Sequence, residues 1–174
     1  MSDAVALHSM RLTARFLPVC VEDGRNIEAR GQQLIAACMA AIAFNNAVLG
    51  LTHAMAHALG AKFHLHHGTA NALLLPHVMR YNRDAAPERM AIVAETLGVD
   101  TASMSMEEAG LAAADAVSEL TKRFDLPQRL RDVEVDPEVF EALAQLALAD
   151  ACLITNPKPV FDPAEIVTLY QRAW

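Results

Sequence analysis

The feature that most constrains this 174-residue sequence is a long stretch without charge: no Asp, Glu, Lys or Arg occurs from Gly31 to Ala61. Such a stretch is buried in a protein core or crosses a membrane, which takes a helix of about 20 predominantly apolar residues. Here polar side chains interrupt the run, namely Gln32, Gln33, Asn45, Asn46, Thr52, His53 and His57. We therefore expect a buried central pair of helices and no membrane span.

Helical periodicity extends along most of the chain. In Ile27, Leu34, Ile35, Cys38 and Ile42, for example, apolar residues recur at the helical period of three or four positions. The strong helix formers Ala, Leu and Met are abundant, and only 7 glycines occur. No convincing strand and no internal repeat is present. The sequence predicts an all-α helical bundle in one domain over residues 1–174, with about seven or eight helices.

Caps, prolines and glycines predict where the first helices begin and end. A first helix should stop near Phe16, because Pro18 and Gly24 follow it. Asn26 should cap the second helix. A third should span 50–60, followed by a loop over 62–68. The next helix should begin at Thr69.

The second half carries similar signals. Pro76 should kink or reset its helix, since proline removes a helical hydrogen bond. A helix over 87–98 has proline at its start and glycine at its end. Ser105 and Glu108 form a capping box for the next. Further helices should span 136–154, capped by Asp136, and 162–174.

Charge and cysteine content exclude several classes of protein. The formal net charge is -7 and the 14 basic residues are scattered, so no nucleic-acid partner is expected. The three cysteines are widely spaced without a CxxC pair, which indicates neither a disulfide framework nor a cysteine zinc site. The N-terminus lacks the features of a signal peptide. We expect a reducing, cytoplasmic setting.

The histidines are clustered: five of the seven lie between His53 and His67. His53 and His57 are four residues apart, on the same face of a predicted helix. Imidazole is the commonest side-chain metal ligand. A zinc-protease HExxH motif is excluded, because Ala54 stands where the glutamate would be.

Each histidine also has a simpler interpretation. A lone histidine on an apolar helix is usually a core or surface residue, and only the cluster favours a functional site. We expect His64 and His66 to face solvent, His77 to lie on a different helix face and His8 to be on the surface. A diiron bundle is disfavoured because no ExxH pair is present.

One run, GLTHAMAHALGAKFHLHHGTANALLLPHVMRYN, resembles the second half of the iron-dependent alcohol dehydrogenase family. The matching pattern is HxxxH, Leu-Gly, His-Gly and LPxVxxxN. In this sequence it is carried by His53, His57, Leu59, Gly60, His67, Gly68, Leu75, Pro76, Val78 and Asn82. Segments before and after the run also resemble the family, up to DACLITNPKPV.

The resemblance implies a fold, a reaction and roles for three residues. The fold would be the helical C-terminal domain of these enzymes, in the dehydroquinate synthase-like superfamily. His53 and His67 would ligate the metal, iron(II) or zinc, while His57 would lie near the nicotinamide of NAD or NADP and handle a proton. The substrate would be a small alcohol or aldehyde, oxidised or reduced by metal-assisted hydride transfer.

Two elements of the family pattern are missing. No GGGS-type phosphate loop and no βαβ alternation occurs, so the nucleotide-binding domain is expected to be absent. The DxxxH motif that would supply two further ligands is also missing, because Leu7 and not a histidine stands four residues after Asp3. Catalytic metal sites usually keep three protein ligands. We expect the chain to be inactive alone and to need a nucleotide-binding domain, supplied in trans by a separate chain or by a lost upstream segment.

A second hypothesis belongs to another class of protein. The mean hydropathy of +0.21 suits a helical module that has lost catalysis and serves assembly, as a homo-oligomer through an exposed apolar face.

Overall fold

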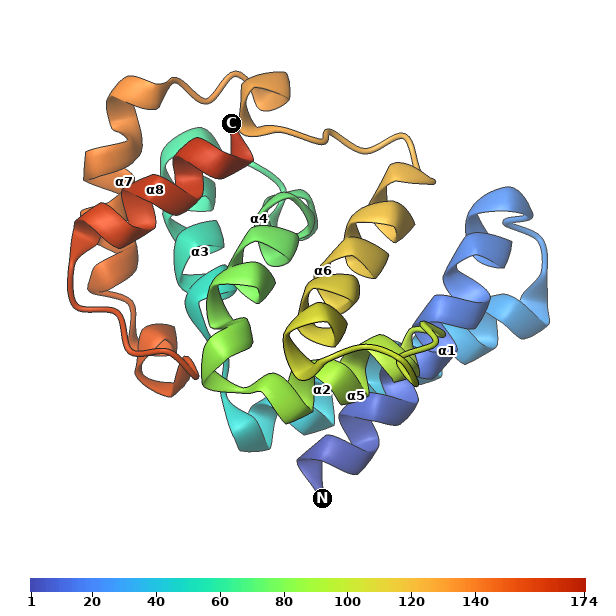
Figure 1. The fold of residues 1–174 in the computed structure, drawn as a ribbon. Coiled ribbons are helices and arrows are strands. Elements are labelled where there is room, and N and C mark those ends of the chain that lie inside the picture. Colours follow the sequence, from blue (N-terminus) through green and yellow to red (C-terminus); the bar gives the residue numbers. More distant parts are fainter.

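The computed structural model describes residues 1–174 as eight α-helices joined by short 3-10 turns, with no strand (Figure 1). The α-helices are α1 Ser2–Glu22, α2 Ile27–Ala47, α3 Leu51–Phe63, α4 His67–Asn82, α5 Pro87–Thr96, α6 Met106–Lys122, α7 Phe140–Leu148 and α8 Pro163–Ala173. The 3-10 turns are η1 Arg83–Ala85, η2 Leu130–Val133, η3 Pro137–Val139 and η4 Ala151–Thr155. The all-α prediction is confirmed.

Several predicted helix caps are present. The Asn26 side chain accepts a hydrogen bond from the backbone of Ala29 at the start of α2. Ser105 and Glu108 form both bonds of the capping box at α6. Each such cap satisfies backbone N–H groups that would otherwise lack a partner. These local signals therefore mark where the two helices start.

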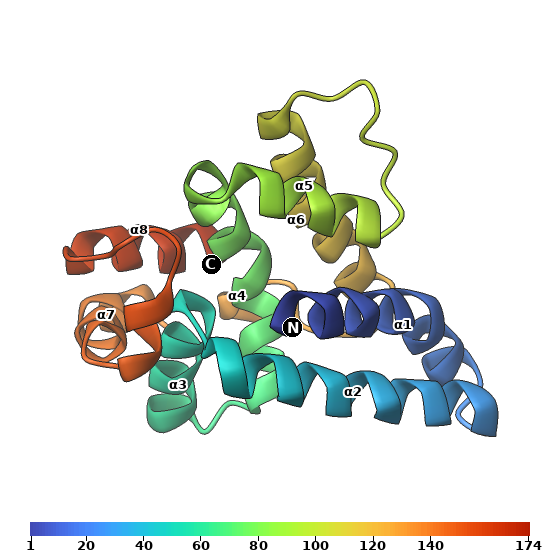
Figure 2. The same ribbon diagram turned by 90° about the horizontal axis from the view of Figure 1, so that it is seen from below.

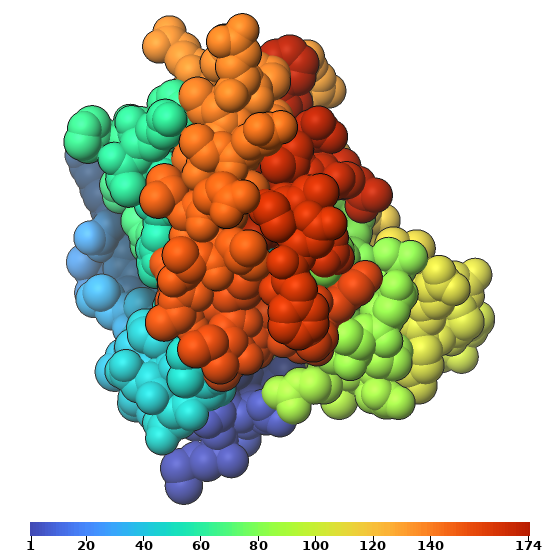
Figure 3. Space-filling model, turned by 90° about the vertical axis from the view of Figure 1, so that its left-hand side faces the viewer, coloured from blue at the N-terminus to red at the C-terminus, as the bar shows by residue number.

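The main core lies among α3, α4, α7 and α8. Its largest buried side chains include Leu51, Met55, Leu59, Leu74, Leu143, Ile166, Leu169 and Tyr170. The Tyr170 hydroxyl donates to the Met55 carbonyl oxygen at 2.9 Å, and its ring stacks on Phe140. Figure 3 shows α7 and α8 side by side on one face of the molecule. Packing on this core holds α3 and α4 in place.

Helices α1 and α2 form an antiparallel pair at one edge of the molecule (Figure 2). The prediction of a buried central helix pair is right for α3 and wrong for α2. Ile27, Leu34, Ile35, Ile42 and Phe44 of α2 are all exposed. The charge-free sequence gives α2 two apolar faces, and α1 covers only one of them.

Some predicted boundaries are also wrong. Helix α1 continues through Pro18 to Glu22, because Pro18 is buried in the fold and tertiary packing outweighs its local cost. Helix α3 extends to Phe63, and α4 begins at His67, so the loop between them is shorter than predicted. Pro76 lies inside α4 and does not end it.

The single helix expected over 136–154 is instead η3, α7 and η4 in succession. The side chain of Asp150 accepts a hydrogen bond from the backbone of Cys152, which caps η4. Aspartate side chains of this kind offer the backbone an alternative to the helix. No single helix is long and apolar enough to span a membrane; α2 and α3 pass that test only when joined, and they meet at 106°.

Candidate functional site

The histidine cluster is built from the first two turns of α3 and the first turn of α4. His53 and His57 lie one turn apart on α3. His64, with a positive φ of 52°, ends α3 and turns the chain, and α4 then starts at His67. The turn between the two helices therefore brings the histidine of the His-Gly motif, on α4, next to the two HxxxH histidines of α3.

The three imidazole rings face one another. The ring centroids lie 5.4 Å apart for His53 and His67, 5.4 Å for His57 and His67, and 6.1 Å for His53 and His57. His53 is half-buried, while His57 and His67 are exposed. The cluster thus lies at the surface, with one ring set deeper than the other two.

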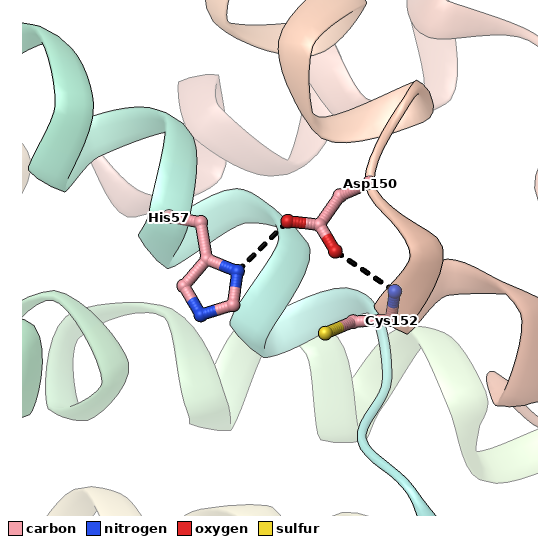
Figure 4. A group of neighbouring side chains, drawn as sticks. All are labelled: His57, Asp150 and Cys152. Atoms are coloured by element: carbon pink, nitrogen blue, oxygen red, sulfur yellow. Dashed lines mark hydrogen bonds and ion pairs between the residues drawn. The ribbon is translucent and has the colours of Figure 1, made fainter.

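Asp150 adds a carboxylate to this site (Figure 4). Its Oδ2 lies 2.8 Å from Nδ1 of His57, and its Oδ1 accepts a hydrogen bond from the backbone N–H of Cys152 at 2.8 Å. An ionised carboxylate only accepts hydrogen bonds, so Nδ1 of His57 carries the proton. Nε2 of the neutral ring is then an acceptor and can take up a hydrogen bond or a proton.

The electrostatics of the site favour this arrangement. Burial alone would raise the pKa of Asp150, but the hydrogen bonds from the Cys152 backbone and His57 outweigh it and lower the pKa. Burial lowers the pKa of His53, and the nearby His67 and His57 lower it further. A lowered pKa keeps the His53 ring neutral, which is the form that ligates metals.

Asp150 and Cys152 were not among the predicted site residues. One ligand atom from each of His57, Asp150 and Cys152 lies within 4.8 Å of the others, a spacing that could hold a metal ion. However, burial and the neighbouring Asp150 raise the pKa of the Cys152 thiol, whereas metal ligation needs the thiolate. We therefore interpret the group as a hydrogen-bonded support for His57.

The sequence signal for Asp150 is weak, because it lies 93 residues from His57. In the sequence it is marked only by the family-like segment DACLITNPKPV, which begins at Asp150 and contains the Asn156-Pro157 motif. Asn156 itself accepts a hydrogen bond from the Leu51 backbone N–H at 3.1 Å and exchanges side-chain hydrogen bonds with Asn82. The motif thus joins the start of α3 to the end of α4, near the site.

The remaining histidines lie as expected. His64 and His66 are exposed in the loop, and His8 is exposed on α1. His77 is half-buried on α4 and lines a different cavity. Near His67, the Asn71 side chain donates to the His67 carbonyl oxygen, while its own oxygen is buried without a partner.

Comparison with known proteins covers the whole chain. Residues 1–174 match the model of the C-terminal part of the Fe-containing alcohol dehydrogenase family. The chain is 41% identical over 173 residues to the 1,3-propanediol dehydrogenase of Citrobacter freundii, covering 99% of this chain and 44% of that protein. It is 41% identical over 174 residues to the lactaldehyde reductase of Escherichia coli K12, covering 100% and 45%.

Solved structures agree with these relationships. A 1,3-propanediol oxidoreductase superposes with a TM-score of 0.97 at 40% identity, covering 99% of this chain and 45% of that one. An alcohol dehydrogenase from Oenococcus oeni superposes with a TM-score of 0.96 at 35% identity, covering 99% and 45%. The chain therefore spans less than half the length of these relatives. It belongs to the iron-containing alcohol dehydrogenase family and corresponds to the C-terminal helical part of those enzymes.

Proposed function

We propose that this chain is the metal- and substrate-binding half of an NAD(P)-dependent alcohol dehydrogenase that acts together with a nucleotide-binding domain. The observation that carries the proposal is the convergence of three imidazoles, with centroids 5.4–6.1 Å apart, where α3 meets α4. His53 and His67 are the proposed metal ligands. The bound iron(II) or zinc would act as a Lewis acid toward the oxygen of a small alcohol or aldehyde.

The residues present are compatible with such a metal. A tetrahedral ion with metal–nitrogen distances near 2.1 Å holds two ligand nitrogens about 3.4 Å apart. Rings with centroids 5.4 Å apart can offer nitrogens at that spacing. His53 is held in its neutral form by burial and by its neighbours, which lower its pKa. Two ligands are fewer than the usual three, so the partner domain would complete the site.

His57 would handle the proton. Asp150 fixes the Nδ1–H form of the ring, so Nε2 is left as an acceptor beside the other two histidines. Hydride transfer itself would require the nicotinamide, which supplies the redox chemistry. The chain's contribution is therefore to hold the metal, position the alcohol and accept its proton.

Reconstitution in trans tests the proposal. The chain is mixed with the separately produced N-terminal half of the C. freundii 1,3-propanediol dehydrogenase, iron(II) and NAD, and NADH formation from 1,3-propanediol is followed. We expect turnover from the mixture and from neither half alone. The His67→Ala chain, tested in parallel, should give none.

Weak association of the two halves could hide activity, so the same halves are also joined in one polypeptide. Absence of turnover in this fused protein, with folding verified by circular dichroism, contradicts the proposal. Equal turnover with His67→Ala contradicts the role given to that residue.

A second candidate function, assembly without catalysis, is favoured by the surface of the chain. Its accessible area is 9748 Å², whereas a monomeric protein of its mass exposes about 8,300 Å². Part of the excess lies on α2, where Leu34, Ile35 and Ile42 are exposed. Apolar surface of this kind usually marks an interface.

Sedimentation equilibrium separates this candidate from the first. A homo-oligomer formed through α2 should dissociate in the Leu34→Glu variant, and the Met104→Glu variant, changed at an exposed methionine outside α2, should leave it intact. A chain that stays monomeric at high concentration contradicts the assembly function.

A further inference from the structure

A second site lies on the other side of α4 from the histidine cluster. A cavity of about 660 Å³, open to solvent, is lined by residues of α4, α6, α8 and the segment that follows α6. On α4 it is lined by Ala72, Pro76 and Arg80, which are four residues apart and share one helix face. At 100° per residue, His67 and Asn71 lie on the opposite face. The cavity is therefore separate from the proposed metal site.

Cationic side chains from four segments surround this cavity. They are Arg80 of α4, Lys122 of α6, Arg129 before η2 and Arg172 of α8. Two are neutralised: Arg80 pairs with Asp115 at 2.6 Å, and Lys122 with Glu119 at 2.7 Å. No other acidic residue lines the cavity.

Two guanidinium groups remain without a carboxylate partner. Neither Arg129 nor Arg172 forms an ion pair, although both line the cavity. This positive lining stands out because the chain as a whole carries a net charge of -7. A guanidinium presents a planar set of donors that matches carboxylate and phosphate oxygens.

An adjoining cavity brings in a further cation, although two carboxylates, Asp84 and Glu165, also line it. It has a volume of about 310 Å³ and shares Arg80 and Arg172 with the first. Lys158 lines it, forms no ion pair and lies 4.3 Å from the centre of the Tyr81 ring.

The pKa of His77 is affected by the same cationic side chains. His77 lines the larger cavity, and burial lowers its pKa; Arg80 and Arg172 lower it further. The two arginines act in this way because a positive surrounding disfavours a second positive charge. The same surrounding attracts an anion.

We propose that this cavity binds a small polyanion, a phosphorylated or polycarboxylate metabolite with at least two negative charges. Arg129 and Arg172 hold the anionic groups from two sides. The volume falls within the range of ordinary ligand pockets. None of the proposed metal ligands lines the cavity, so the proposal does not rest on the proposed function.

Titration with inorganic pyrophosphate tests the site. The ¹⁵N-labelled chain, free of added metal, is titrated at constant ionic strength set with sodium chloride, and NMR shifts are followed. We expect saturable shifts at His77 and at the ends of α6 and α8. Arg172→Gln and Arg129→Gln should each weaken binding at least tenfold.

Two controls separate the site from general attraction. Arg30→Gln removes the same charge from an exposed arginine of α2 that forms no ion pair, and binding should not change. His67→Ala removes a proposed metal ligand and should also leave binding unchanged. Arg129 and Arg172 are both exposed, so the Arg129→Gln and Arg172→Gln variants should fold normally.

Citrate, tested in the same way, distinguishes phosphorylated from polycarboxylate ligands. Binding of pyrophosphate alone supports a phosphorylated ligand. Binding of both anions supports a wider range of polyanions. A dissociation constant weaker than about 10 mM for both anions overturns the proposal. So does a loss of affinity in Arg30→Gln equal to that in Arg172→Gln.

Discussion

At the scale of single residues, the arrangement of His57 depends on Asp150. The carboxylate holds Nδ1 of the ring at 2.8 Å and is itself fixed by the Cys152 backbone. His57 is exposed, so packing alone would leave its ring free to turn. One hydrogen bond therefore sets both the orientation of the ring and the nitrogen that is left to accept a hydrogen bond.

Removing that carboxylate should release the ring. In Asp150→Ala we expect the His57 ¹⁵N signals to change from a single Nδ1–H form to a mixture of both neutral forms, because no acceptor holds the Nδ1 proton. Asp136→Ala is the control. It removes an aspartate that caps η3 and forms no bond to His57, so the His57 signals should not change. Identical His57 spectra in wild type and Asp150→Ala contradict the positioning role.

His77 should make stability depend on pH. Its pKa in the folded chain lies below the ordinary 6.5, so below about pH 6.5 the unfolded chain binds a proton that the folded chain resists. Stability contributed by the neutral ring is complete above that pH and is lost as the pH falls.

Urea unfolding at pH 7.5 and pH 5.5 measures this effect. We expect His77→Gln to lose less stability between the two pH values than wild type, while His8→Gln, changed at an exposed position, should lose as much as wild type. An equal loss in wild type and His77→Gln shows that the ring is not disfavoured in its charged form.

At the scale of elements, the site depends on how α3 and α4 are held together. Asn156 is buried, and its side chain bonds the Leu51 backbone, Asn82 and the Lys158 carbonyl oxygen. These bonds connect the segment after η4 to both helices. The amide thus holds together the elements that carry His53, His67 and Asp150.

Loss of this amide should be costly. Asn156→Ala leaves the Leu51 N–H and the Asn82 side chain without partners, and we expect the free energy of unfolding to fall by more than about 2 kcal/mol. Asn45→Ala, at an exposed asparagine of α2, should change it by less than about 0.5 kcal/mol. Similar midpoints for the two variants in urea would mean that the Asn156 bonds contribute little.

Sequence reasoning succeeds for these elements where the signal is local. The caps at Asn26 and at Ser105 are confirmed, because each depends on residues within one helical turn. It fails where contacts between distant residues determine the extent of a helix, as in the continuation of α1 through the buried Pro18. Asp150 was missed for the same reason, since only the fold brings it to His57.

At the scale of the whole molecule, the chain has an exposed apolar surface and matches only part of its relatives. The chain matches the C-terminal part of enzymes more than twice its length, and it exposes apolar residues along α2. The charge-free stretch from Gly31 to Ala61 predicted burial for both helices, yet α2 keeps an uncovered face. Sequence patterns show that a face is apolar, but they do not show which element covers it.

His53 and His67 are the proposed metal ligands, and anaerobic titration with iron(II), repeated with zinc, tests their role directly. Isothermal calorimetry should show that His53→Ala and His67→Ala each abolish binding, whereas His57→Ala and the surface control His8→Ala retain it. Loss of binding in His57→Ala and Asp150→Ala, with His53→Ala and His67→Ala unaffected, would place the ion on the carboxylate side of the cluster and contradict this account.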